Sequence, residues 1–184
     1  MSNSCYKLID IAPEKIVVNT HTITPIPDGT DHWSTDLDVN TLLTPGAKRK
    51  LSSRFGNLFA IGFSIRPNVD KGSIHIDLET GTLQPFWPSL NVVTSGQGVM
   101  RWFKPAKRGS LHKVTEKRFY KAWFSDYGEP IDEWATGKVA LVKTDIAHQV
   151  WNFDNEIRQI ISIRWANRST WEETVEWFDK EFKL

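Results

Sequence analysis

The sequence predicts an all-β domain, either a sandwich or a barrel, with an amphipathic helix at its C-terminal end. From Asn57 onward, short runs rich in β-branched and aromatic residues recur between turn residues, with almost no helical period. A helical period appears only after Ser169. The 184 residues suffice to bury a continuous core, and nine Trp, ten Phe and three Tyr supply the apolar area that it needs.

The first fifty residues are predicted to be mostly loop, because prolines and glycines interrupt the short runs there. One edge strand is expected over Lys15 to Thr20, and a short helix over Leu37 to Leu43. Lys48-Arg49-Lys50 is interpreted as a solvated basic patch. Residues 1–56 are therefore expected to form an N-terminal extension of the core.

The β core is expected over residues 57–166. Its predicted strands are the runs Leu58 to Ile65, Ser73 to Asp77, Leu90 to Thr94, Gly98 to Phe103, Lys138 to Lys143, Gln149 to Phe153 and Arg158 to Trp165. Glycines occupy the expected hairpin turns, where a positive φ is favourable: Gly81, Gly96, Gly98 and Gly137.

The C-terminal segment, residues 169–183, is predicted to be a helix laid against the sheet. Ser169-Thr170-Trp171-Glu172 has the capping-box pattern, and Val175, Phe178 and Phe182 follow at helical spacing. No internal repeat or linker divides the chain. We therefore expect one domain over residues 1–184.

Composition and charge exclude several classes of protein. A single cysteine, Cys5, cannot form an internal disulfide, which fits a reducing compartment, and we expect a cytoplasmic location. No apolar run is long enough to span a bilayer. Lys and Arg number 23 against 22 acidic residues, so no general field attracts nucleic acid or lipid.

Two of the five histidines are candidates for chemistry; His21, His32 and His112 lie in polar stretches and are expected at the surface. His75 and Asp77 flank Ile76, and strand alternation places both on one face, side by side, as neighbouring metal ligands require. The pair alone also fits a solvent-facing polar pair on a half-exposed strand.

His148 lies at a strand boundary in an apolar neighbourhood and is the predicted third ligand. Two imidazoles and one carboxylate on one side of a divalent ion form the facial triad of non-heme Fe(II) oxygenases, which leaves positions open for substrate and O₂. The alternative is a core histidine bonded to a backbone carbonyl.

Arg158 opens the last predicted strand, and alternation places Ser162 and Arg164 on the same face. An arginine in an otherwise apolar strand is costly to bury unless it meets an anion, and its planar fork suits a carboxylate. Ser162 is a further candidate for the same anion, and Arg164 is a competing receptor.

With these residues the chain resembles the Fe(II)- and 2-oxoglutarate-dependent dioxygenases, whose His-x-Asp, distal His and later basic residue match His75, Asp77, His148 and Arg158. The resemblance covers about residues 58–165. It implies a double-stranded β-helix, the cupin-like jelly-roll with eight core strands, and a hydroxylase. It further implies that the first three residues bind iron and that Arg158 receives the distal carboxylate of 2-oxoglutarate. The family often has Ser or Thr two residues after the arginine, where this chain has Ile160.

Further candidates surround this motif. Asn91 lies amid apolar residues and needs a polar partner such as the co-substrate or a water, unless it is a satisfied structural amide. Four tryptophans are candidates for the substrate rim, with core packing as the alternative for Trp102: Trp87, Trp102, Trp123 and Trp134.

A basic stretch with interleaved rings runs from Arg101 to Tyr127 and suits an anionic substrate or single-stranded nucleic acid. The acidic residues that follow it argue against nucleic acid. We expect a small-molecule or peptide substrate and no membrane partner, while exposed aromatic residues would permit a dimer. Two other hypotheses remain open: a cupin-like metalloprotein that does not use 2-oxoglutarate, and a non-catalytic β-sandwich binding module in which the three ligands do not converge.

Overall fold

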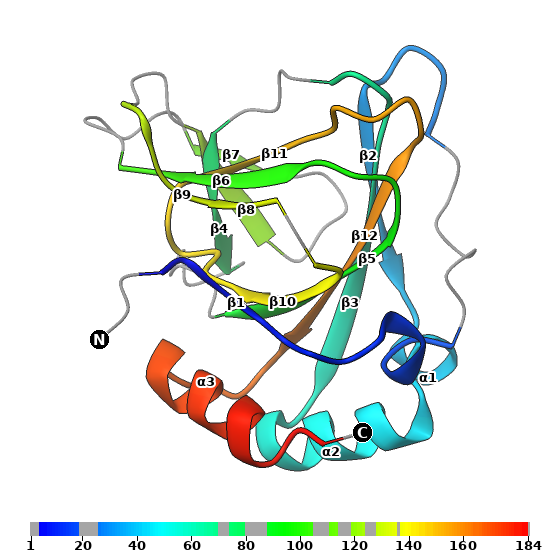
Figure 1. The fold of residues 1–184 in the computed structure, drawn as a ribbon, viewed down its shortest axis with the longest axis vertical. Helices are drawn as coiled ribbons and strands as arrows, with labels where there is room; N and C mark the ends of the chain where they lie inside the picture. Colours follow the sequence, from blue (N-terminus) through cyan, green and yellow to red (C-terminus); the bar gives the residue numbers. More distant parts are fainter. Residues whose placement is uncertain are drawn as a thin grey trace.

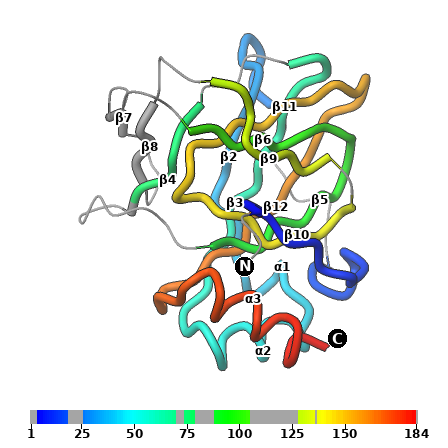
Figure 2. Tube along the Cα trace, turned by 60° about the vertical axis from the view of Figure 1, so that its left-hand side comes forward, coloured from blue at the N-terminus to red at the C-terminus, as the bar shows by residue number. Residues whose placement is uncertain are grey.

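The computed structural model describes residues 4–18, 26–69, 74–79, 88–104, 111–113, 119–123, 128–135 and 137–183. Within these residues, two six-stranded sheets form a sandwich whose strands pair antiparallel. The helices gather at one end of it (Figures 1 and 2). The all-β prediction is confirmed.

The first sheet contains both the first and the last strand of the predicted β core. Its strands, in spatial order, are β1 (Tyr6–Leu8), β10 (Val139–Val142), β5 (Ser89–Ser95), β12 (Arg158–Trp165), β3 (Leu58–Ile65) and β2 (His32–Leu37). The second sheet has the order β7 (Leu111–Lys113), β8 (Phe119–Trp123), β4 (His75–Glu79), β11 (His148–Trp151), β6 (Val99–Phe103) and β9 (Pro130–Trp134).

The path of the chain between the sheets is that of a jelly-roll. Strands β3, β4, β5 and β6 alternate between the first and second sheets, and β9, β10, β11 and β12 return in the opposite sense. This is the double-stranded β-helix that the resemblance implied. The β7–β8 hairpin is inserted between β6 and β9 and pairs with the edge of β4.

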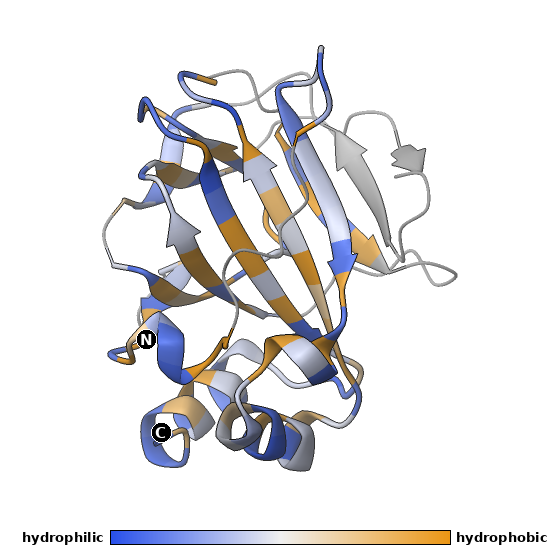
Figure 3. Ribbon diagram, turned by 90° about the vertical axis from the view of Figure 1, so that its right-hand side faces the viewer, coloured by the Kyte–Doolittle hydropathy of each residue, from blue (hydrophilic) through white to orange (hydrophobic). Residues whose placement is uncertain are grey.

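The predicted strands of the core agree with the structure, β3 and β12 to the residue. Alternation is visible along the strands in Figure 3, where hydrophobic and hydrophilic residues follow one another. On β12, Ile161, Ile163 and Trp165 pack outward against the helices, whereas Ile160 packs between the sheets. Strand β12 therefore separates the core beneath the helices from the interior of the jelly-roll.

One expectation for the N-terminal segment, the edge strand over Lys15 to Thr20, is wrong, and the segment contains elements that were not expected. Residues 15–18 form no strand: η1 (Pro13–Lys15) is a 3₁₀ turn, and Val17 makes a single bridge to Leu43. The Lys48-Arg49-Lys50 run lies within helix α2 (Pro45–Phe55), which follows α1 (Val39–Leu42). Both β1 and β2 join the first sheet, so residues before 57 build the sandwich as well as extend it.

Helix α2 was missed because its apolar stripe is narrow. Ala47, Leu51 and Phe55 recur every four residues and are buried, while basic residues fill the other face. Thr44 caps the helix by accepting a hydrogen bond from the Ala47 N–H, and Pro45 occupies the first turn.

The C-terminal helix is confirmed as α3 (Trp171–Lys180), with its start shifted by one residue. Thr170, not Ser169, is the N-cap, and it exchanges capping-box hydrogen bonds with Glu173. The helix packs Phe178 against Phe55 of α2, whose ring stacks on Trp165 at 4.4 Å between centroids.

Candidate metal centre

The predicted triad converges in the interior of the jelly-roll. His75 and Asp77 lie on β4, and His148 begins the neighbouring strand β11 directly opposite His75. The two imidazole rings are 4.5 Å apart between centroids. One possible ligand atom from each residue lies within 4.8 Å of the other two.

These side chains fit a divalent ion. His148 Nδ1 lies 2.8 Å from the carbonyl oxygen of Ile146, so this nitrogen carries the proton and donates, which leaves Nε2 with a lone pair for a metal. His75 Nε2 lies 3.6 Å from Asp77 Oδ1. Because two atoms bound to one ion at about 2.1 Å lie at most about 4.2 Å apart, only a small inward movement completes the site.

Arg164 forms an ion pair with the carboxylate of the triad, Asp77. Its Nη2 donates to Asp77 Oδ2 at 2.6 Å, and both side chains are 4% exposed. Its Nε donates to Ser162 Oγ at 3.3 Å. The sequence predicts Arg164 as a competing receptor for the co-substrate; in the structure its guanidinium orients a candidate metal ligand, Asp77, with Oδ1 directed to the histidine side.

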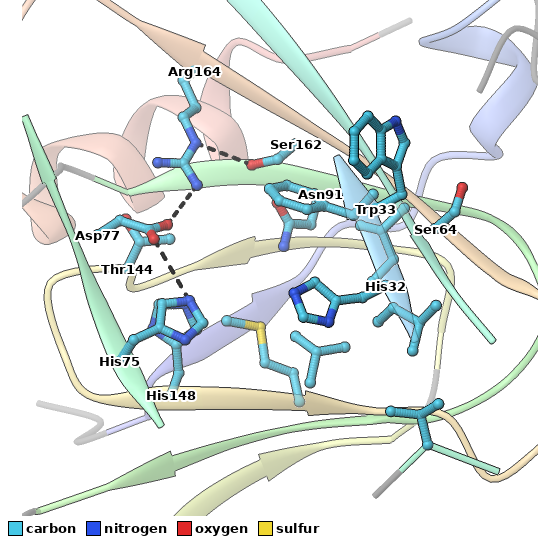
Figure 4. A pocket seen from close by; sticks show the side chains of 16 residues that line it. His32, Trp33, Ser64, His75, Asp77, Asn91, Thr144, His148, Ser162 and Arg164 are labelled. Atoms are coloured by element: carbon cyan, nitrogen blue, oxygen red, sulfur yellow. Dashed lines mark hydrogen bonds and ion pairs between the residues drawn. The ribbon is translucent and has the colours of Figure 1, made fainter. Parts of the chain in front are cut away.

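A cavity of about 100 Å³ adjoins the triad (Figure 4). Its polar lining residues are His32, Ser64, His75, Asp77, Asn91, Thr144, His148, Ser162 and Arg164. Its apolar lining residues are Trp33, Phe63, Ile65, Val69, Met100, Val150 and Ile160. The structure thus brings the predicted residues Asn91, Ser162 and Arg164 together with the triad.

Arg158 does not line this cavity. Its side chain is 2% exposed, and its Nη1 donates to the carbonyls of Val99 (3.1 Å) and Trp151 (2.9 Å). No carboxylate of the described residues pairs with it, and burial lowers its pKa to about 10. Arg158, which the resemblance assigns to the co-substrate carboxylate, therefore lies outside the lining of this cavity, where backbone carbonyls of β6 and β11 hold its guanidinium.

Two of the predicted rim tryptophans are core residues instead. Trp102 and Trp134 are almost fully buried in one apolar cluster, and Trp102 Nε1 donates to the Lys143 carbonyl at 2.8 Å. Trp123 lies on β8 at the register position opposite His75, but its side chain is outside the described part of the structure. Trp87 lies outside the described residues.

His32 is the residue that the sequence did not identify. Expected at the surface, it stands on β2 and lines the cavity, and Figure 4 shows its imidazole directed toward the pair His75 and His148. The β-prone run that follows it, Trp33 to Thr35, was the available indication of a strand.

Comparisons with known proteins add little to this geometry. No protein-family model matches the chain, and no curated protein matches it. Among the described residues, no helix has the length and apolar character needed to cross a membrane.

Solved structures resemble the chain only distantly. Coconut allergen cocosin aligns over 85% of the chain with 15% identity and a TM-score of 0.39. Salicylate 1,2-dioxygenase from Pseudoaminobacter salicylatoxidans aligns over 76% with 9% identity and a TM-score of 0.38. A mutant of Bacillus subtilis oxalate decarboxylase aligns over 78% with 11% identity and a TM-score of 0.37. The chain spans 30%, 26% and 28% of these proteins respectively.

Proposed function

We propose that this protein is a metal-dependent oxygenase of the cupin-like jelly-roll type, with Fe(II) held by His75, Asp77 and His148. The observation that carries the proposal is the convergence of two imidazoles and one carboxylate beside a cavity. The alternative of a non-catalytic binding module required that these residues stay apart, and they do not.

The chemistry of the donors favours iron over a structural zinc site. All three candidate ligands offer nitrogen or oxygen, and the single cysteine, Cys5, does not line the cavity. When bound, Fe(II) would supply activation of O₂ at the positions that the protein leaves open. The chain orients the ligands through Arg164 and Ile146 and limits water with the apolar wall of Met100, Val150 and Ile160.

Metal binding is tested by anaerobic titration of Fe(II) and Co(II) into the purified protein. We expect one ion per chain, and a loss of affinity of at least about 100-fold in His148→Ala and Asp77→Ala, since each removes one of three ligands. Asp36→Ala, at an exposed position of β2 outside the cavity lining, is the matched control. Equal binding by all four proteins would refute the metal site.

Two forms of this function differ in their use of 2-oxoglutarate. The distal histidine begins β11 and Arg158 begins the last core strand, as the resemblance requires, and Arg158 is a buried cation without a described carboxylate. This supports a 2-oxoglutarate-dependent hydroxylase, which would turn 2-oxoglutarate and O₂ into succinate, CO₂ and a hydroxylated substrate.

The cupin-like form without 2-oxoglutarate is supported by the partners of both arginines. Arg164 is engaged by Asp77, and Arg158 donates to two carbonyls away from the cavity. Because Asp77 already pairs with Arg164 and Arg158 does not line the cavity, this form agrees better with the structure. Titrating 2-oxoglutarate into the anaerobic Fe(II) protein separates the two, since only the first form gives a metal-to-ligand charge-transfer band and makes succinate in air.

A further inference from the structure

We propose that Asn91 and His32 form a two-point receptor for a carboxylate on the ligand that approaches the metal. The receptor stands across the cavity from the triad, and the proposal rests on the metal site described above. The carboxylate belongs either to a co-substrate or to the substrate that is oxidised.

Asn91 supplies a directed donor. It lies on β5 and is 7% exposed. Its Oδ1 lies 3.2 Å from Ser89 Oγ and accepts from that hydroxyl, so the orientation of the amide is fixed. Within the described part of the chain, no group accepts a hydrogen bond from the Asn91 amide nitrogen, and Figure 4 shows this nitrogen directed into the cavity. This nitrogen therefore opens onto the cavity and can donate to an acceptor on the ligand.

His32 supplies the second point from another strand of the same sheet. Strand β2 is the edge of the first sheet, and His32 pairs in register with Ile65. Its side chain is exposed yet lines the cavity, so it stands at the mouth, whereas Asn91 and Asp77 are buried. His32 is therefore accessible to a ligand at the cavity mouth.

The charges around the cavity favour a ligand that is negatively charged and accepts hydrogen bonds. Asp77 is the only carboxylate that lines it among the described residues, and its Oδ2 is occupied by Arg164. A divalent ion would add two positive charges to that of Arg164, against one negative charge. The other polar side chains of the lining are uncharged amides and hydroxyls or imidazoles, namely those of His32, Ser64, Asn91, Thr144 and Ser162 besides the two triad histidines. The ligand therefore brings the negative charge and the acceptor oxygens.

The test uses the Co(II)-loaded protein, with acetate as the probe and acetamide as its uncharged counterpart. Calorimetry measures affinity for the probe, and the visible spectrum of Co(II) reports retention of the ion. We expect acetate to bind more tightly than acetamide. Asn91→Leu, which keeps the volume but removes the donor, and His32→Ala should each weaken acetate binding about tenfold, with Co(II) affinity changed less than about twofold.

Asp36→Ala, on the same strand as His32 but outside the cavity lining, should bind acetate like the unaltered protein. Because His32 is exposed, its variant keeps the test valid even if Asn91→Leu does not fold. Unchanged acetate affinity in His32→Ala, or no acetate binding by the Co(II)-loaded protein, would overturn the receptor. Failure to bind Co(II) would instead refute the metal site.

Repeating the titration with 2-oxoglutarate identifies the source of the carboxylate. If both variants also weaken 2-oxoglutarate binding about tenfold, the receptor serves the co-substrate. If they weaken acetate alone, it serves the oxidised substrate. In either case the receptor itself is supported.

Discussion

The two ends of strand β12 each bury an arginine on the same face, and the two arginines have different partners. Arg164 pairs with the carboxylate of Asp77 beside the candidate metal ligands, at 2.6 Å. Arg158, six residues earlier, donates to the carbonyls of Val99 and Trp151 outside the cavity. Two arginines on one strand face thus have different partners: a carboxylate at one end of β12 and backbone carbonyls at the other.

The difference shows why an arginine in an apolar strand does not by itself identify an anion site. Burial disfavours a charge in both places, but an ion pair offsets the cost at Arg164, whereas neutral carbonyls leave the pKa of Arg158 lowered to about 10. Arg158 lies beneath the β5–β6 turn, where a Cβ on Gly98 would lie 2.5 Å from its Nη1. The backbone of the β5–β6 turn therefore packs closely against the Arg158 guanidinium.

The largest effect is expected at the Arg164 end. Arg164→Met leaves Asp77 buried without its cation and should lower the free energy of unfolding by about 3–5 kcal/mol, measured by urea titration. The same variant should weaken metal binding about 10- to 100-fold, because the carboxylate loses its orientation. Combining it with Asp77→Asn should restore part of the stability but not the metal affinity. A stable Arg164→Met with normal metal affinity would contradict the role of the pair.

Substitution in the β5–β6 turn above Arg158 should lower the stability of the protein nearly as much. Gly98→Ala places a Cβ against the Trp151 carbonyl and the Arg158 guanidinium, so we expect a loss of about 2–3 kcal/mol in the same titration. Gly29→Ala is the matched control: its φ of +78° is also unfavourable for alanine, but no atom lies within 4 Å of the added Cβ. That control should lose only about 1 kcal/mol. Equal losses would mean that crowding at Gly98 is unimportant.

A smaller effect is expected for Arg158 itself. Arg158→Met removes two hydrogen bonds to carbonyls but also relieves a buried charge, so the net loss of stability should be about 1–2 kcal/mol. Metal affinity should stay within about twofold of the unaltered protein, because Arg158 does not line the cavity. A loss of metal binding comparable to that of Arg164→Met would remove the distinction between the two ends.

The smallest effect concerns Cys5, which packs in one cluster with Ile160 between the two arginines. Burial, reinforced by Asp132, raises the pKa of its thiol to about 11 from 9.0. Since folding favours the neutral thiol, this stabilisation is complete below pH 9 and is lost as the pH rises from 9 toward 11. Alkylation by iodoacetamide at pH 8 should therefore be slow in the folded protein and fast in urea; rapid labelling of the folded protein would indicate local opening.

Local pattern was sufficient for the β core and for the pair of His75 and Asp77. A period of two along β3 and β12 and a period near 3.6 in α3 are properties of consecutive residues, so those elements could be predicted from sequence alone. His75 and Asp77 share a strand face for the same reason. The N-terminal segment was harder to predict, because β1 and β2 are edge strands whose pairing partners lie far along the chain.

The sequence by itself determined the strand alternation, the donor types of the candidate metal site and the position of the C-terminal helix, since each depends on neighbouring residues. Only the tertiary structure decided which of two arginines meets Asp77, that Trp102 and Trp134 lie in the core, and that His32 faces the triad. Those outcomes depend on how the two sheets face each other. The partner of a side chain across the sandwich depends on strand register and on packing between segments that are far apart in the sequence. A pattern of neighbouring residues does not specify such contacts.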